Sequence, residues 1–490
     1  MPSPRSDTPV APTMQDRLAR LASGVIGGPA GDHAVNPPRR RFWTPLRVVL
    51  FTGLVFFAIH WLQKYPCATP DSWVDWSQYT GACYTDVKAL WWAERLHEGA
   101  VPYRDHQVEY PVLTGFLMGV LGRVAYMLMN ILDADSQVGA SIFYQLNAVA
   151  LFICGVVAIA VLHAIRERGT AAPFGPEPPG GRPSRPWDAM LLAAAPVVLV
   201  TATVNWDLFA VALALPFFLF WQRGRPVAAG VFLGLATAAK FYPLLFAGPL
   251  LVLALRNRRP LPALTSIATA AGVWAVVNAP VAALWQESWL RFFELNSERP
   301  VDWGTGWYVL RALTESERLW DPEFVNDAYL GSFAASCLAI AALGYFAQRR
   351  SDGAEDAAPR LAQLCFLVVA AFLLFGKVWS QQYVLWLLPL AVLARPKWGM
   401  FMLWQAAELF YFFAFYGKML QVSAEDGRGI PEWLFLTAAS ARWLAVAAMC
   451  AWVVFEILNP RLDWVRVLPA RPTPAAPPPP GRGEADPAPA

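Results

Sequence analysis

Titratable side chains are concentrated in one stretch of the chain, residues 83–111. The stretch combines carboxylates, imidazoles and guanidinium groups in a protein in which only 15% of residues are charged. Its members are Asp86, Glu94, Arg95, His97, Glu98, Arg104, Asp105, His106 and Glu109. Carboxylate and imidazole groups are the side chains that most often transfer protons in enzymes. We therefore expect any acid–base chemistry of this protein to occur here.

The start of this stretch has the pattern of a short helix. Thr85 or Asp86 can cap its beginning, and Gly99 followed by Pro102 indicates its end, which predicts about 14 helical residues. The Trp91–Trp92 pair suits a water–lipid boundary, where the indole ring stays in apolar surroundings while its N–H stays wet. The pattern predicts a helix that lies flat on a membrane face.

Composition places the whole chain among polytopic membrane proteins. Hydrophobic residues make up 56% of the 490 residues and aromatic residues 14%, well above the balance of a soluble domain. The net charge of +3 is small, and nothing in the sequence suggests nucleic-acid binding. Membrane lipids are therefore the first expected partners.

Two tails flank a predicted membrane domain that spans residues 45–460. Residues 1–44 have no apolar core, and Arg39, Arg40 and Arg41 directly precede the first apolar run, so this tail should stay in the cytosol. Residues 461–490 are mostly Pro, Ala, Gly and Arg, a composition that cannot bury enough apolar surface to fold. We predict disorder in both cytosolic tails.

Basic clusters determine the predicted topology, because Lys and Arg are retained on the cytosolic side. The first span leaves the chain outside, so residues 64–140 form a large external loop. The apolar segment 110–131 is interrupted by Pro111 and Arg123. If it crossed, the arginines that follow the next span would lie outside, so we predict a re-entrant or flat segment beside a cavity.

The remaining apolar runs alternate so that nearly every basic cluster is cytosolic. The fold class predicted is an all-α membrane protein with about 12 transmembrane helices and both termini in the cytosol. The predicted spans are 45–62, 141–165, 188–204, 208–221, 227–239, 241–255, 261–285, 329–347, 361–376, 383–394, 399–416 and 433–458.

Three polar groups interrupt the apolar pattern at turns on the predicted external side: 205–207, 240–243 and 377–383. Asn205 and Asp207 can cap a helix or serve a site, and Lys240 can extend towards lipid headgroups or bind a lipid phosphate at a helix break. An interfacial aromatic belt accounts for Trp379 and Tyr383. It leaves the polar residues of 377–383 unexplained, namely Lys377, Gln381 and Gln382.

The six cysteines divide by predicted compartment. Cys67 and Cys83 share the external loop, where a disulfide between them would persist. The others fall in predicted spans, where a buried thiol behaves as a small apolar group. These are Cys154, Cys337, Cys365 and Cys450. No Cys or His spacing matches a metal site, so we assign none.

Five motifs follow one another in a fixed order: Tyr84-x-Asp86, Gly99-x-x-Pro102-Tyr103-x-Asp105, Tyr110-Pro111, Asn205, and Ala229-Gly-x-x-x-Gly-x-x-x-x-x-Lys240-x-x-Pro243. Their types and order resemble those of the membrane-embedded C-type glycosyltransferases. Within these, the chain is most similar to glycosyltransferase family 87, the polyprenol-phosphate-mannose-dependent mannosyltransferases, over roughly residues 45–460. Val112 stands where that family usually has a second proline.

The resemblance implies an inverting enzyme of the plasma membrane that serves cell-envelope biogenesis without a cofactor. It would move a sugar, most simply mannose, from a polyprenyl-phosphate donor to a lipid or glycan acceptor outside the cytoplasmic membrane. Asp86 would be the base, with Glu109 and Asp105 in reserve, and Lys240, Arg104 or Lys377 would contact the donor phosphate. Residues expected to line the substrate are Trp91, Trp92, Tyr103, Asn205, Asp207, Trp379, Gln382 and Tyr383.

Two other classes of function stay open from the sequence alone. A flippase or transporter of a lipid-linked sugar would also need intramembrane charges and a cavity. It predicts functional residues near mid-membrane, whereas the unusual polar residues here gather at one face, which favours an enzyme. A structural membrane partner is a third possibility.

Overall fold

The computed structural model describes residues 42–167, 184–348, 358–463 and 465. Over these residues the chain is helical, with one isolated bridge between Pro102 and His106 and no strand. The predicted tails, residues 1–44 and 461–490, lie almost entirely outside the described residues. The described part includes one large hydrophobic core cluster to which most of the long helices contribute.

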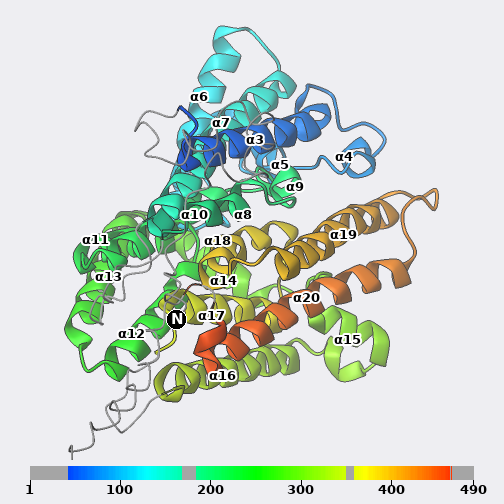
Figure 1. Ribbon diagram of the computed structural model, residues 1–490. Coiled ribbons are helices and arrows are strands. Elements are labelled where there is room, and N and C mark those ends of the chain that lie inside the picture. The colour runs from blue at the N-terminus through cyan, green and yellow to red at the C-terminus, as the bar shows by residue number, and fades with distance from the viewer. Residues whose placement is uncertain (1–41, 168–183, 349–357, 464, 466–490) are drawn as a thin grey trace, which may run out of the picture.

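The first part of the described chain contains three long helices, α3, α6 and α7, and a set of short ones. Its elements are α3 (Pro45–Ala68), α4 (Ser77–Thr80), α5 (Asp86–Ala93), the 3-10 turn η1 (Leu96–Glu98), α6 (Val112–Ile131) and α7 (Ser136–Glu167). Figure 1 shows α3, α6 and α7 together at the top of the view.

The middle part contains shorter and broken helices. Its elements are η2 (Pro186–Ala189), α8 (Met190–Ala193), α9 (Val198–Thr201), α10 (Asp207–Gln222), α11 (Pro226–Ala239), η3 (Tyr242–Phe246), α12 (Ala247–Arg256) and α13 (Pro260–Leu284). Proline at the first position begins α11 and α13, where its missing N–H costs no hydrogen bond.

The last part completes the bundle. Its elements are α14 (Gln286–Glu298), α15 (Gly306–Thr314), η4 (Glu317–Trp320), α16 (Pro322–Phe346), α17 (Leu361–Phe375), η5 (Gln381–Tyr383), α18 (Val384–Ala394), α19 (Trp398–Ser423), α20 (Glu432–Leu458) and η6 (Pro460–Leu462). In Figure 1, α10 and α18 lie between the helices at the top and α16, α17 and α20 at the bottom.

Six described helices are long and apolar enough to cross a membrane: α3, α6, α7, α13, α16 and α20. Five shorter apolar helices accompany them. Each of the 12 predicted spans coincides with one helix or with consecutive short helices; the run 188–204, for instance, is divided into η2, α8 and α9. The membrane-protein class is therefore supported, while the number of crossings stays a prediction.

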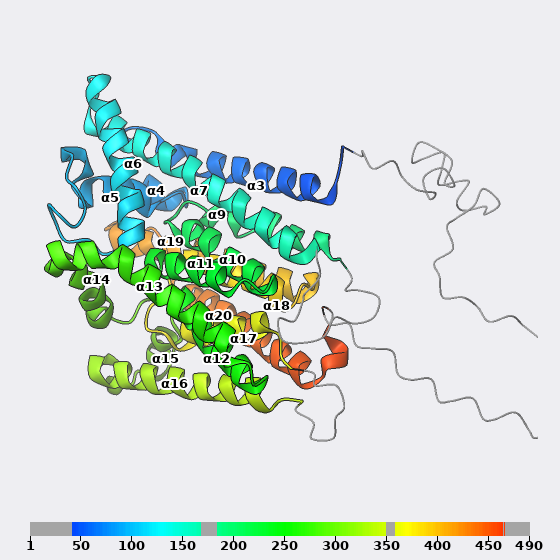
Figure 2. The same cartoon turned by 90° about the vertical axis from the view of Figure 1, so that its left-hand side faces the viewer.

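The helix α6 is oriented differently from its neighbours. In Figure 2, α3 and α7 run side by side from one end of the molecule to the other, whereas α6 runs crosswise at the end that carries α5 and α14. Its length and composition alone would allow a crossing. The crosswise orientation favours a flat segment, one of the two alternatives that the basic clusters predict.

The expected helix of about 14 residues after Thr85 is wrong in its length. The structure ends α5 at Ala93, places Arg95 in the left-handed region with φ 51°, and continues only with η1. The cause is packing against α6. Leu96 is buried, and a Cβ added to Gly122 of α6 would lie 3.1 Å from the Leu96 side chain. The chain therefore turns so that Leu96 can reach this glycine.

Arginines hold the helix ends opposite to α5. Arg166 and Arg360 both donate hydrogen bonds to the carbonyl of Leu393, in the last turn of α18, at 2.9 and 2.7 Å. Arg256 does the same for Ala347 at the end of α16, at 2.7 Å. Carbonyls in the last turn of a helix lack an intrahelical partner, so these contacts satisfy them.

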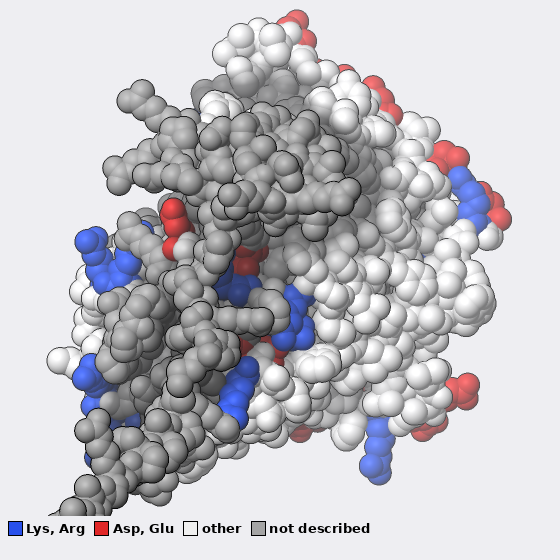
Figure 3. Space-filling model, in the orientation of Figure 1, with Lys and Arg blue, Asp and Glu red and all other residues white. Residues whose placement is uncertain are grey.

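Basic residues gather at the end where α3 begins and α20 ends. Figure 3 views this end and shows Lys and Arg mainly on its left and centre, with broad uncharged surface on the right. The turn between α10 and α11 contributes Arg223 and Arg225 to the chain's basic clusters, and the turn between α12 and α13 contributes Arg258 and Arg259. The elements α5 and α14 lie at the opposite end (Figure 2).

Candidate functional site

A cavity of about 320 Å³ opens at the end of the molecule that carries α5 and α14. Its walls come from segments that are far apart in the sequence. They are Tyr84, Asp86, Glu109, Tyr110, Pro111, Asn205, Lys240, Phe241, Tyr242, Phe292, Leu295, Asn296, Arg299, Phe372, Val378, Ser380, Gln381, Gln382, Tyr383, Trp386, Phe415, Tyr416 and Met419. The cavity thus joins the loop between α3 and α6 to the ends of α11, α14, α17 and α19.

Asp86 is fixed at the first turn of α5. The Thr85 side chain caps this helix by accepting a hydrogen bond from the Val87 N–H at 3.2 Å, and its hydroxyl donates to the Thr203 carbonyl at 2.7 Å. The Asp86 N–H donates to the Val204 carbonyl at 2.9 Å. These bonds attach the start of α5 to the segment before α10, so the carboxylate has a defined position.

Asn205 links the Asp86 carboxylate to the rest of the cavity wall. Its Nδ2 donates to Asp86 Oδ2 at 2.9 Å and to the Tyr110 hydroxyl at 2.8 Å. Its Oδ1 accepts from the Trp206 N–H at 2.7 Å and from Lys240 Nζ at 3.4 Å. The backbone donor fixes which way the amide points, so its NH₂ faces the carboxylate and its oxygen faces the ammonium.

Lys240 lies at the C-terminal end of α11, where the helix breaks into extended backbone. Its Nζ is 3.3 Å from Asp207 Oδ1, and its side chain is only 12% exposed. The rings of Tyr110, Tyr383 and Trp386 surround the ammonium at 5.6, 5.8 and 5.9 Å. An ammonium has three N–H donors. Asn205 and Asp207 occupy two of them within the described residues, which leaves one for a ligand.

Burial raises the pKa of the Asp86 carboxyl. The Asn205 amide, the Tyr84 hydroxyl and the Lys240 charge act against this rise because they stabilise the ionised form. A carboxylate with a raised pKa binds a proton more strongly than an ordinary one. This property suits a group that must remove a proton from a hydroxyl.

Two charged residues occupy the exposed part of the cavity wall. Glu109 is exposed and lines the cavity beside Tyr110. Arg299, at the C-terminal end of α14, is also exposed and lines it. Sequence reasoning did not identify Arg299 because nothing in the pattern of α14 shows that its end reaches Lys240. The cavity therefore has a second cation in addition to Lys240.

Buried polar contacts support the cavity wall that follows α17. Arg442 donates to the carbonyls of Trp379 and Ser380, each at 3.0 Å, and pairs with Glu408 at 3.0 Å. The Arg442 guanidinium lies 4.1 Å from the Trp379 ring centroid. Trp379 is consequently buried beneath the wall, while Gln382 and Tyr383 line the cavity.

Several residues singled out from the sequence lie away from the cavity. Lys377 donates to Asn326 and to the Ser297 carbonyl, at 2.8 and 2.6 Å. Arg104 and Asp105 pair with each other in an exposed position, and this contact lowers the pKa of the Asp105 carboxyl to about 2. None of these three charged groups lines the cavity.

Three aromatic residues of the first loop and one buried carboxylate, all expected to line the substrate, have other contacts. The indoles of Trp91 and Trp92 donate to Ser136 Oγ at 3.2 and 2.8 Å. The hydroxyl of Tyr103 donates to the Tyr110 carbonyl at 2.9 Å. Asp207 is fully buried and holds Lys240. None of these four lines the cavity, whereas Asn205, Gln382 and Tyr383 do.

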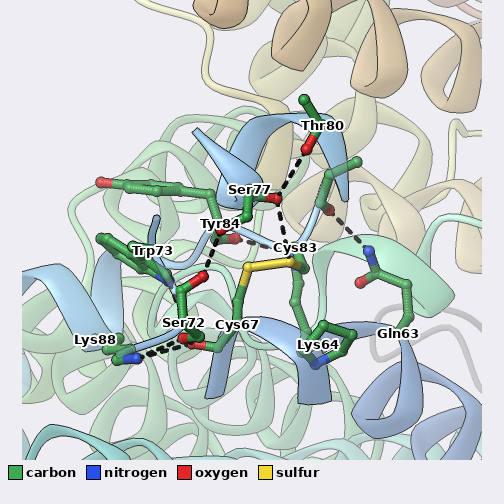
Figure 4. Close-up of a disulfide and its surroundings, with 12 residues drawn as sticks. Gln63, Lys64, Cys67, Ser72, Trp73, Ser77, Thr80, Cys83, Tyr84 and Lys88 are labelled. Carbon is green, nitrogen blue, oxygen red and sulfur yellow. Dashed lines mark hydrogen bonds between the residues drawn. A yellow bond between two sulfur atoms is a disulfide. The ribbon is translucent and has the colours of Figure 1, made fainter. Parts of the chain in front are cut away.

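A disulfide joins Cys67, near the end of α3, to Cys83, three residues before Asp86 (Figure 4). Their Cα atoms are 5.6 Å apart. Beside it, Gln63 donates to the Ala82 carbonyl at 2.8 Å and Lys64 to the Tyr84 carbonyl at 3.0 Å. The end of α3 thereby fixes the segment that leads into the cavity.

No group of three or more His, Cys, Asp or Glu side chains among the described residues is arranged to hold a metal ion. The charged groups that line the cavity are instead the half-buried Asp86 carboxylate, the Lys240 ammonium and, at the exposed side, Glu109 and Arg299, with the amide of Asn205 between Asp86 and Lys240. Such a set can accept a proton at one point and stabilise an anion nearby.

The family comparison agrees with this arrangement. Glycosyltransferase family 87 matches residues 109–376, more than half of the chain, and this region contains Tyr110, Asn205, Lys240 and Arg299. Asp86 precedes the matched region. No curated protein matches the chain. The resemblance inferred from the order of the motifs is confirmed, and the chain belongs to glycosyltransferase family 87.

Proposed function

We propose that this glycosyltransferase moves a sugar, mannose, from a polyprenyl-phosphate donor to a lipid or glycan acceptor at the external face of the cytoplasmic membrane. One observation supports the proposal above all others. The Asp86 carboxylate and the Lys240 ammonium line the same cavity, and the amide of Asn205 links them. A proton acceptor and a cation that line one cavity suit a direct displacement at a sugar phosphate.

In the proposed reaction, Asp86 accepts the proton of an acceptor hydroxyl while the hydroxyl oxygen attacks the anomeric carbon of the sugar. A bond forms between this oxygen and the anomeric carbon, and the bond from that carbon to the phosphate oxygen breaks. The electron pair of the broken bond leaves with the phosphate. Because the attack comes from the side opposite the leaving group, the configuration at the anomeric carbon inverts.

Lys240 and Arg299 would stabilise the negative charge that develops on the departing phosphate. The third N–H of Lys240 is available to a phosphate oxygen, while Asp207 and Asn205 hold the ammonium in place. Arg299 lies on the exposed side of the same cavity, where a guanidinium can bind two phosphate oxygens at once.

The apolar part of the cavity wall supports the proposal that the sugar donor is linked to a lipid. Phe241, Phe292, Leu295 and Phe372 line the cavity and would contact the first isoprenyl units beyond the phosphate. The rest of the isoprenyl chain would remain in the bilayer. A water-soluble nucleotide sugar would not require this apolar wall.

Gln382 is proposed to contact the sugar itself. It is 5% exposed and lines the cavity, and its Oε1 has no hydrogen-bond partner within the described residues. A buried acceptor without a partner is costly, so a ligand that supplies a donor is favoured there. A hydroxyl of the transferred sugar would satisfy this oxygen.

The distribution of charge supports an external site. Basic residues gather at the end of the molecule opposite to α5 and α14 (Figures 2 and 3). Under the positive-inside rule that end faces the cytosol, so both termini would be cytosolic and the cavity would face outwards. The protein would then use donors that have already been carried across the membrane.

A transfer assay with the purified enzyme in lipid nanodiscs tests this function. Polyprenyl-phosphate carrying radiolabelled mannose is supplied together with a lipid extract that contains acceptor glycolipids. We expect a labelled glycolipid whose new anomeric configuration, measured by NMR, is opposite to that of the donor. Retention of configuration would contradict the proposed displacement.

The same materials distinguish the enzyme from a flippase. In sealed vesicles, a flippase would move the labelled donor from one leaflet to the other without making a glycosidic bond. Label that changes leaflet but remains entirely on the polyprenyl phosphate would contradict the proposed function.

A further inference from the structure

A row of aromatic rings leads from the cavity to the outer surface of the loop between α3 and α5. Tyr84 and Tyr416 line the cavity, with ring centroids 6.4 Å apart. Tyr79 lies 6.0 Å from Tyr84 and 6.4 Å from Tyr416. Trp76 stacks nearly parallel on Tyr79 at 6.0 Å and is 36% exposed. We call these four rings the aromatic row.

The loop that carries the outer half of the row is held in an unusual conformation. Asp75 and Trp76 both occupy the left-handed region, with φ 51° and 61°, which is uncommon for residues with side chains. Such conformations persist only where the surroundings enforce them, and they cluster at functional sites. Arg428 supplies part of this constraint through two hydrogen bonds to the Asp75 carboxylate, at 2.9 and 2.6 Å.

The other side of this loop is fixed as well. Lys88 of α5 donates to the carbonyls of Cys67 and Thr69 at 3.0 and 2.7 Å, and to Ser72 Oγ at 3.0 Å. Figure 4 shows these contacts beside the disulfide, with Trp73 and Tyr84 adjacent. The aromatic row is therefore formed before any ligand arrives, which lowers the entropic cost of binding.

The surroundings of Trp76 are polar, which argues against a role as a lipid anchor. Asp71 and Asp75 are exposed in the same loop. Arg428 of the α19–α20 loop forms ion pairs with Asp75, the residue before Trp76, and with the exposed Asp426. Charged groups of this density are unfavourable in hydrocarbon. A ligand that is dissolved in water and still has an apolar face matches these surroundings better.

A saccharide has both properties. One face of a pyranose ring presents C–H groups that are attracted to the negative face of an aromatic ring, while its hydroxyls can donate to exposed carboxylates. We propose that the aromatic row binds the saccharide chain of the acceptor, at sugar residues beyond the one whose hydroxyl reacts at Asp86. The inference rests on the proposed function, because the reacting hydroxyl at Asp86 gives the row its direction.

Transfer kinetics with two synthetic acceptors test whether the aromatic row binds the saccharide chain of the acceptor. Octyl α-mannoside has one sugar and is too short to extend beyond Asp86, whereas octyl α-mannotrioside has three. In the Trp76→Ala variant we expect the KM for the trisaccharide to rise about fivefold, in line with the loss of one aromatic stacking contact. The KM values for the monosaccharide and for the donor should not change. Trp76→Phe should recover most of the affinity for the trisaccharide.

The matched control is Val74→Ala, which changes an exposed side chain of the same loop that is outside the row. A role of Trp76 in anchoring the loop to lipid would alter the kinetics of both acceptors or of neither. An equal KM change for the two acceptors, or no difference between Trp76→Ala and Val74→Ala, would overturn the proposal.

Binding without turnover separates this inference from the proposed function. In saturation-transfer NMR, free mannotriose should receive magnetisation from the intact protein and from Asp86→Asn, and much less from Trp76→Ala. If mannotriose binds in this way but no transfer occurs, the proposed function fails and the row stands. If the intact protein gives mannotriose no signal, the row is wrong, whatever the outcome of the transfer assay.

Discussion

At the scale of single residues, Asn205 sets how strongly the Asp86 carboxylate holds a proton. Burial raises the pKa of this carboxyl, and the hydrogen bond from Asn205 works in the opposite direction. A base acts only when ionised, so kcat/KM should be full above this pKa and should fall as the pH drops through it. Because the pKa is raised, the fall should occur at a higher pH than for an ordinary carboxyl group.

Replacing Asn205 with Leu should therefore move the acid limb of the kcat/KM profile to still higher pH. The change removes a donor that stabilises the ionised carboxylate. Tyr110→Phe is the matched control, since it removes the other partner of the same amide and leaves the Asp86 contact intact. The measurement is the profile of kcat/KM against pH for the unchanged enzyme and for the two variants. An acid limb that stays in place, or moves to lower pH, in Asn205→Leu would contradict the role of Asp86 as base.

Arg299 is the clearest case of a site residue that the sequence did not indicate. Arg299→Ala should lower kcat/KM for the polyprenyl-phosphate donor about tenfold, the loss expected for a charged hydrogen bond at an exposed site. The protein should fold normally because the side chain is exposed. Arg291→Ala, on the same helix and outside the cavity, is the control. Equal kinetics in the two variants would remove Arg299 from the site.

The contrast between Asp86, Lys240 and Lys377 shows how far residue-level prediction reaches. Asp86 and Lys240 were identifiable because each follows a local signal, a helix cap and a helix break, and both line the cavity. Lys377 has a similar sequence context, yet its ammonium points to Ser297 and Asn326. The direction of a side chain in a loop depends on contacts with distant segments, and local patterns do not contain that information.

At the scale of elements, the bounds of the long helices were largely predictable and the bends were not. Hydrophobic runs locate helices such as α13 and α20, because this feature acts locally. The helix α16 begins at Pro322, seven residues before the predicted run 329–347. The early end of α5 has a tertiary cause, namely the contact between Leu96 and Gly122 of α6. The aromatic row likewise combines residues 76–84 with Tyr416, a pairing that only the folded chain brings together.

The disulfide should stabilise the fold because it joins α3 to the segment that leads into α5. Replacing both Cys67 and Cys83 with Ser should lower the free energy of unfolding by about 3 kcal/mol, the value expected for closing a loop of about 15 residues. Denaturant unfolding in detergent micelles measures the change, with Cys337→Ser as a control outside the loop. Mass spectrometry of unreduced peptides that shows both thiols free would contradict the disulfide in the native protein.

At the scale of the whole molecule, the sequence predicted the class of fold and the order of its segments. A re-entrant or flat segment 110–131 beside a cavity is predicted by one argument, that an extra crossing would put basic residues on the wrong side. The crosswise orientation of α6 favours the flat alternative (Figure 2). The sequence did not show which helices come together to form the walls of the cavity. Its walls come from helices whose mutual arrangement depends on packing, such as the approach of α14 to Lys240.

Topology is testable by labelling single cysteines introduced into a protein that keeps only Cys67 and Cys83. Cysteines at Asp135 and Glu315 should react with a membrane-impermeant maleimide in intact cells. Cysteines at Arg258 and Arg461 should react only after the membrane is opened. External labelling at Arg258 would contradict the proposed orientation, because this position belongs to the basic clusters that define the cytosolic side.

The central claim is that Asp86 is the base of a sugar transfer in this cavity, and one substitution tests it most directly. Asp86→Asn keeps the shape of the side chain and removes its basicity, so transfer from polyprenyl-phosphate mannose should fall about 10²- to 10⁴-fold. Donor affinity should be retained because Lys240 and Arg299 are unchanged. Asp133→Asn, at an exposed position after α6, is the control for folding and expression. Transfer by Asp86→Asn at the rate of the unchanged enzyme would contradict the account.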